Sequence, residues 1–201
     1  MKRRTFDSIF SLGGVVVTAV LVVAGALLMW GYSFANSQVH NQLSQQQITY
    51  PSAAAFAEAK AGTEVTPAMV PYLAKYAGQQ LTTGAQAEAY ADHFIAEHLA
   101  AMPYGGVYSK ASAAALADPT NTKLQGVVNT IFKGTTLRGL LLEAYAFSKF
   151  GQIALIAGIC SFALALLMGL LSVFGFWHLR RTDEADEVLT GTHPVKELIF
   201  S

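Results

Sequence analysis

"LGGVVVTAVLVVAGALLMW", residues 12–30, is a run of nineteen residues without a single charged side chain. We extend this span to residue 34, and a second uncharged stretch covers residues 151–177. Each reaches the roughly 20 residues needed to cross a hydrocarbon core about 30 Å thick. Charged residues make up only 13% of the chain, against roughly a quarter in an ordinary soluble domain. The sequence therefore predicts two transmembrane helices, residues 12–34 and 151–177.

Basic residues next to the two spans predict their orientation. These residues are Lys2, Arg3, Arg4, Arg180 and Arg181. Short flanks rich in Lys and Arg stay on the cytoplasmic side, whereas a long segment crosses largely regardless of its charge. Residues 35–150 carry seven basic and seven acidic side chains, so charge does not hold them inside. We therefore expect residues 1–11 and the tail, 178–201, in the cytoplasm, and residues 35–150 outside it.

The polar stretch "SFANSQVHNQLSQQQ", residues 33–47, directly follows the first span. Ser33 and Ala35 have the spacing of a signal-peptide cleavage site, but the apolar run exceeds the 7 to 15 residues of a typical signal core. We expect the chain to keep this first span. Isolated apolar residues, with no Gly or Pro before Pro51, then favour a helical stalk, and a flexible glutamine-rich linker is the alternative.

Helix signals continue through the outer segment. Thr66 followed by Pro67 predicts a helix start, and Pro71 predicts either a kink or a second start. Thr83 and Gln86 form a capping-box pattern at the start of the clearest helix in the chain. No segment alternates like a strand.

Breaks between the later helices come from glycine, proline and asparagine. "YGG", residues 104–106, should end the capping-box helix. A short alanine-rich helix over 111–117 and a longer one from about Asn121 should follow, and Gly134 is a possible break in the latter. The sequence predicts an all-α membrane protein, a two-transmembrane-helix hairpin with an extracytoplasmic helical domain.

Small residues recur every fourth position in the second span and, less completely, in the first. Such faces allow helix backbones to approach closely in lipid. We expect the two spans to pair with each other, and contact with another protein or a second copy is the alternative. The predicted helix-packing residues are Gly14, Thr18, Gly25, Ala157, Ser161, Ala165 and Gly169.

One polar cluster stands out as a candidate for chemistry. It consists of Glu88, Asp92, His93, Glu97 and His98. Residues four apart on a helix are neighbours, which joins Glu88 to Asp92 and His93 to Glu97. The two histidines are five apart and point in different directions, and the His-Glu-x-x-His pattern of zinc proteases is absent. We interpret the cluster as a solvated helix face, with a weak metal or proton-sensing site as the alternative.

Other motifs for chemistry are missing. The sequence lacks a Gly-x-Ser-x-Gly elbow, a phosphate-binding glycine loop and a Cys-x-x-Cys pair, and its one cysteine, Cys160, lies in the second span. A basic patch for nucleic acid is also missing. We therefore expect no enzyme activity, no cofactor, no catalytic or metal site and no nucleic-acid partner.

The stretches "ANSQVHNQLSQQQITYP" (35–51), "TPAMVPYLAKYAGQQLTTGAQAEAYADHFI" (66–95) and "GTTLRGLLLEAYAFSKFGQIA" (134–154) support a family comparison. In these stretches the chain resembles a group of actinobacterial-type two-span membrane proteins of unknown function. The resemblance covers most of residues 1–181. It implies a location in a bacterial plasma membrane and supplies no active site.

The sequence predictions converge on a protein that works by binding. We expect a non-catalytic accessory or scaffolding subunit of an envelope or membrane complex, or a homo-oligomer, in contact with the bilayer. The alternative is an extracytoplasmic sensor or ligand-binding module. Because its cytoplasmic tail is only about two dozen residues long, too short for a signalling domain, a sensor would need a partner to relay its signal.

Overall fold

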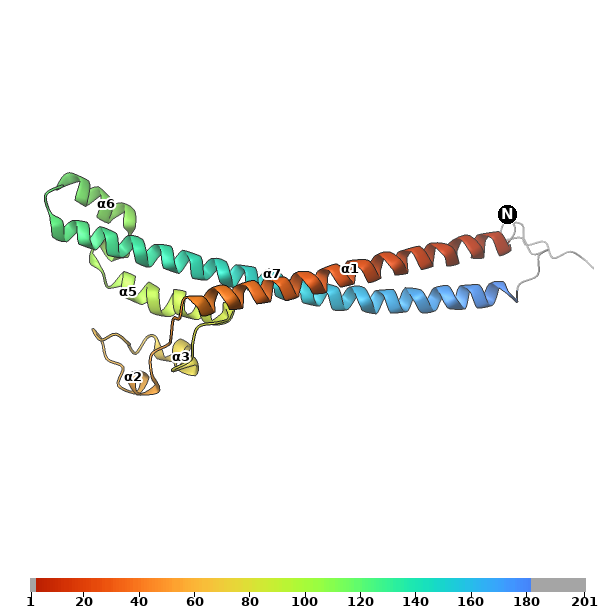
Figure 1. Cartoon of the computed structure of the whole chain (residues 1–201), viewed down its shortest axis with the longest axis horizontal. Helices are drawn as coiled ribbons and strands as arrows, with labels where there is room; N and C mark the ends of the chain where they lie inside the picture. Colours follow the sequence, from red (N-terminus) through yellow and green to blue (C-terminus); the bar gives the residue numbers. More distant parts are fainter. Residues whose placement is uncertain (1–2, 182–201) are drawn as a thin grey trace, which may run out of the picture. The chain divides into compact units, whose positions relative to one another are not determined.

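The computed structural model describes residues 3–181, and in this part of the chain the fold is all-helical (Figure 1). The α-helices are α1 (Arg3–Gln45), α2 (Ala53–Ala57), α3 (Val70–Leu73), α4 (Gly84–Ala89), α5 (Ala96–Ala100), α6 (Tyr108–Ala117) and α7 (Thr122–Leu179). The 3₁₀ turns are Ala74–Tyr76 and Pro103–Gly106, and a π-helix, Tyr90–Ile95, joins α4 to α5. Within residues 3–181 no strand forms, and one isolated bridge joins Thr49 and Gln80. The predicted all-helical class is confirmed.

The chain divides into two compact units, and the two long helices contribute to both. The hairpin unit consists of Met1–Gly31 and Ile153–Ser201, and the domain unit of Tyr32–Gln152. α1 and α7 are the only described helices long and apolar enough to cross a membrane. Most of the predicted tail lies outside the described residues.

Small side chains form the contact between the two antiparallel helices of the hairpin unit. Twelve buried and half-buried positions recur at alternating intervals of three and four residues, and all but Leu21, Leu28 and Met168 are small. They are Ser11, Gly14, Thr18, Leu21, Gly25 and Leu28 in α1, and Gly158, Ser161, Ala165, Met168, Ser172 and Gly175 in α7. This heptad spacing keeps one narrow face of each helix toward the other. We call these twelve positions the seam.

Large apolar side chains of the hairpin unit point away from the seam. Leu27 is 63% exposed, Leu166 67% and Phe174 60%. Only 11% of the most apolar window of each helix is buried, whereas the core helix of a soluble protein is mostly buried. The hairpin unit therefore presents an apolar outer surface along helices that could span a membrane.

The domain unit has the opposite arrangement, with large apolar residues inside. Its core joins the outer part of α1 to the short helices and to α7. The core residues are Val39, Leu43, Tyr50, Phe56, Val65, Met69, Leu73, Leu81, Ala87, Ala91, Ile95 and Leu141. Nearer the start of α7, Ile131 is fully buried, as is Ala111 of α6.

The stalk prediction was right about the helix and wrong about its surroundings. α1 continues to Gln45, as the lack of Gly and Pro indicated. Beyond residue 31, however, it belongs to the domain unit, and its buried stripe is Ala35, Val39 and Leu43. Phe34, in contrast, is 47% exposed. The outer part of α1 is therefore a core helix of the domain unit.

Two other boundary predictions need correction. Thr66 does not cap a helix, because α3 begins at Val70, with Pro71 in its first turn. The second start predicted at Pro71 is therefore the one that forms. Gly134 does not break α7, which continues without interruption for 58 residues.

Candidate functional site

The predicted polar cluster lies around the π-helix of the domain unit. The capping box forms as expected, with Thr83 accepting from the Gln86 backbone N–H and the Gln86 side chain accepting from the Thr83 backbone. Seven residues after Thr83, at Tyr90, the helix widens into the π form. A π-helix has i→i+5 bonds and often occurs at functional sites. It changes the direction of the side chains that follow, including Asp92 and His93.

Asp92 pairs with α7. Its Oδ1 accepts a hydrogen bond of 2.7 Å from Arg138 Nη2, and Arg138 Nε donates to the Ala91 carbonyl at 3.3 Å. Both side chains are more than one-third exposed, at 39% for Arg138 and 36% for Asp92. Such an ion pair is typically worth at most about 1 kcal/mol. It fixes the register of the π-helix against α7 more than it stabilises the domain.

Glu88 also reaches α7, through Tyr145. A hydrogen bond to the Glu88 carboxylate raises the pKa of the Tyr145 hydroxyl, with desolvation and the Asp92 charge adding to the effect. Both acidic residues of the predicted Glu88–Asp92 pair therefore face α7. Their observed role is to hold the π-helical segment against this long helix.

The two histidines go to separate aromatic partners. His93 stacks on Tyr72, with ring centroids 3.6 Å apart and planes 4° apart. His98 Nδ1 donates to the Phe94 carbonyl at 2.7 Å, and its ring lies 4.5 Å from that of Phe94. Among the described residues, Glu97 forms no ion pair with His93. The arrangement does not gather the cluster around one point, and residues 3–181 contain no group of three His, Cys, Asp or Glu suited to a metal.

Tyr50 is a buried polar residue that the sequence interpretation missed. It is 2% exposed and donates a hydrogen bond of 2.5 Å to the Gln86 carbonyl. Its ring packs edge-on against Tyr90 at 5.4 Å. Burial, with smaller effects from neighbouring tyrosines, raises its pKa. The hydroxyl joins the segment between α1 and α2 to α4, and no local motif could have indicated a partner 36 residues away.

The predicted helix-packing residues lie at or beside the seam. Ser161 Oγ donates to the Leu21 carbonyl at 2.8 Å, and Ala165 is 4% exposed. A Cβ added at Gly169 would lie 3.6 Å from Thr18 Cγ2, which is ordinary contact. Ala157 is half-buried at the edge.

Glycines let the hairpin helices approach closely at other levels. A Cβ added at Gly14 would collide with the Ser172 side chain, and one at Gly25 would lie 3.0 Å from the Phe162 ring. In the second span the sequence reasoning followed a strict step of four residues, and in the first it began at Gly14. It therefore missed Ser11, Gly158, Ser172 and Gly175, which alternating steps of three and four would have found.

A groove with a volume of 460 Å³ runs along the outer parts of α1 and α7, within the domain unit. Gln38, Gln42 and Gln46 line the α1 side together with Phe34, above the buried Val39 and Leu43. Leu140, Glu143, Ala144 and Phe147 line the α7 side. The groove thus combines exposed apolar side chains, three neutral amides and one carboxylate.

Comparison with known proteins adds no assignment. The chain matches no protein-family model, no curated protein and no solved structure. The resemblance to actinobacterial-type two-span proteins therefore remains an expectation. The candidate sites are surfaces, namely the seam, the clamp between the π-helix and α7, and the groove.

Proposed function

We propose that this chain is a bacterial plasma-membrane protein whose hairpin unit spans the bilayer, with both termini in the cytoplasm and the domain unit outside. The observation that carries the proposal is the inverted packing of the hairpin unit. Small residues fill the seam, and large apolar residues such as Leu27 and Leu166 face outward. In water this surface would be costly, at about 25 cal/mol for each Å² of exposed apolar area, whereas lipid tails remove that cost.

The charges at the helix ends support the orientation. Arg180 and Arg181 directly follow α7, and Arg181 lies 3.9 Å from the Trp177 ring centroid. Basic side chains beside an interfacial aromatic are typical of the cytoplasmic end of a span. Arg3 and Arg4 begin α1, which is antiparallel to α7.

The accessory or scaffolding role is supported by the surfaces of the domain unit. The clamp residues Glu88, Asp92 and Arg138 are engaged in holding helices together. The groove, in contrast, leaves Phe34, Leu140 and Phe147 about half exposed. Such a surface on a membrane-anchored domain suits a protein that binds other proteins.

Cysteine labelling tests this topology in intact cells. In a Cys160→Ala background, Lys110→Cys on α6 should react with a membrane-impermeant maleimide, whereas Thr182→Cys should react only after permeabilisation. Lys110 is exposed, so access depends on the side of the membrane alone. Labelling of position 182 in intact cells, or no labelling of position 110, would exclude the proposed orientation.

A further inference from the structure

A groove runs between α1 and α7 within the domain unit. Its α1 side runs from Phe34 to Gln46, which are twelve residues apart. At 1.5 Å per residue, this side is about 18 Å long. Val39 and Leu43 form its buried floor, and Leu141 of α7 is buried in the core. The groove is therefore the uncovered face of a packed helix pair.

The walls determine which kind of polypeptide the groove fits. Both walls are α-helices, whose backbone N–H and C=O groups are used within the helix. An extended peptide would find no edge to hydrogen-bond with, so strand addition is excluded. A helix of about twelve residues matches the length, with an apolar stripe against Phe34, Leu140 and Phe147.

The charge of the groove distinguishes a different protein from a second copy. Glu143 is the only charged residue that lines it, and within the described residues Glu143 has no ion-pair partner. A second copy packed groove to groove would bring another Glu143 and no basic residue. A partner with one Lys or Arg at this level would instead pair with the carboxylate.

The amides distinguish a protein helix from a lipid chain. Gln38 and Gln42 lie one turn apart on α1, and Gln46 directly follows its last residue. An acyl chain would remove water from these amides without replacing its hydrogen bonds, which costs free energy for each buried amide. Polar side chains of a partner helix replace them.

We infer that the groove binds a helix of a different membrane protein, one that carries an apolar stripe and a single basic residue opposite Glu143. This inference rests on the proposed membrane anchoring, because Phe34 directly follows the apolar run of α1. The partner helix therefore rises from the same bilayer, beside α1 and α7.

Site-specific photo-cross-linking tests the inference on the full chain in its own cells. Benzoylphenylalanine in place of Gln42 should give a light-dependent adduct with a different polypeptide. The same probe at Asn41, which is exposed but does not line the groove, should give none. Mass spectrometry should map the adduct to an apolar helical segment with a Lys or Arg within about one turn of the cross-link.

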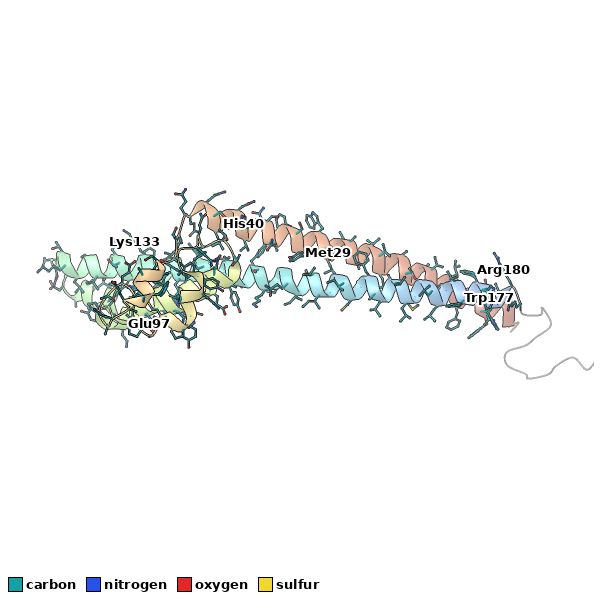
Figure 2. The ribbon with its side chains drawn as sticks, turned by 90° about the horizontal axis from the view of Figure 1, so that it is seen from below. Met29, His40, Glu97, Lys133, Trp177 and Arg180 are labelled. Atoms are coloured by element: carbon teal, nitrogen blue, oxygen red, sulfur yellow. The ribbon has the colours of Figure 1, made fainter. Side chains whose placement is uncertain are left out.

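Charge reversal makes the test specific for Glu143. Glu143→Lys should reduce the adduct by up to about fivefold, the upper limit for one exposed ion pair. Glu97→Lys, on the α5 side of the domain unit, should leave it unchanged (Figure 2). Replacing the partner's mapped basic residue by Glu should restore the adduct of Glu143→Lys.

Several results would overturn the inference. An adduct with twice the mass of this chain would assign the groove to a second copy, and an adduct with lipid alone would assign it to the bilayer. An adduct undiminished in Glu143→Lys would exclude the charge pair, and absence of an adduct at Gln42 would exclude the docking helix. The maleimide labelling of Lys110→Cys is repeated on the same cells. If position 110 is labelled and Gln42 gives no adduct, the docking helix is excluded while the proposed topology still holds.

Discussion

The hairpin unit and the domain unit are packed in opposite ways. In the hairpin unit the contact is made by small residues such as Ser161 and Ala165, and large apolar side chains face outward. In the domain unit large residues such as Leu73 and Leu141 are fully buried. Two helices, α1 and α7, take part in both arrangements without a break. The change in packing therefore follows from the side chains and not from the type of secondary structure.

This difference matches the force that would act on each unit in the proposed topology. In water, burial of large apolar side chains is the main source of stability, so the domain unit places them inside. In lipid that drive is lost, and helices associate through close backbone approach and hydrogen bonds. Gly14 and the bond from Ser161 to the Leu21 carbonyl supply both in the hairpin unit. The comparison predicts that shortening a buried side chain lowers stability most in the domain unit. Enlarging a small side chain at the helix contact should lower stability most in the hairpin unit.

The largest expected effect comes from a truncation in the domain core. Leu141→Ala removes a fully buried side chain and leaves a cavity, which should lower the free energy of unfolding by about 2–5 kcal/mol. Chemical denaturation of the purified protein, followed by circular dichroism, measures the loss. Leu140→Ala is the matched control, since Leu140 is 53% exposed and should cost less than about 0.5 kcal/mol. Equal losses for the two variants would contradict the assigned core.

Enlargement at the seam should have the next largest effect. Ala165→Leu or Ser161→Leu inserts atoms between two closely packed helices, at an expected cost of about 1–3 kcal/mol. Thermal denaturation in detergent and in lipid provides the measurement. Leu164→Ile changes an outward side chain that is 51% exposed, and its stability should match the wild type. If both enlarged variants keep wild-type stability, the seam does not stabilise the hairpin.

A smaller effect is expected at the buried hydroxyl of Tyr50. Tyr50→Phe removes the hydrogen bond to the Gln86 carbonyl and should cost about 1 kcal/mol. Because burial raises the pKa of Tyr50, the folded domain keeps this proton more tightly than the unfolded chain does. The resulting stability is complete below the unfolded pKa of about 10 and is lost as the pH rises toward the folded value.

Denaturation between pH 8 and 11 measures that dependence. The wild type should lose stability above about pH 10, and Tyr50→Phe should lose less over the same range. Tyr108→Phe is the control, because Tyr108 is 43% exposed and should leave the pH profile unchanged. Identical alkaline profiles for the wild type and Tyr50→Phe would show that this hydroxyl does not contribute.

Local signals in the sequence predicted the helical class, the capping box and the turn at residues 104–106, because each depends on neighbouring residues. Tyr104 and Gly105 adopt positive φ there, as a chain reversal requires. The uninterrupted α7 was not predicted, because Gly134 packs against Leu99 and this contact compensates for its low helix propensity. The environment of a residue decides whether a glycine ends a helix.

The candidate sites were harder to predict than the fold. Asp92 and Arg138 are 46 residues apart, and only the packing of the π-helix on α7 brings them together. A π-helix has no sequence pattern comparable to a capping box. The directions in which Asp92 and His93 point could therefore not be predicted from the sequence. The seam could be predicted in part, because the sequence shows where small residues recur. Their register depends on the opposite helix, which the sequence alone does not give.

The central claim is that the two apolar helices of one chain pair along the seam, and a cysteine pair tests it most directly. Thr18→Cys with Gly169→Cys, in the Cys160→Ala background, places two thiols where a Cβ at residue 169 contacts Thr18 at 3.6 Å. Oxidation in membranes should give a disulfide within one chain, because a Cβ at residue 169 would touch the Thr18 side chain. Val16→Cys with Leu171→Cys, both on outward faces, should give none. Bonds only between chains, or none for the seam pair, would contradict the account.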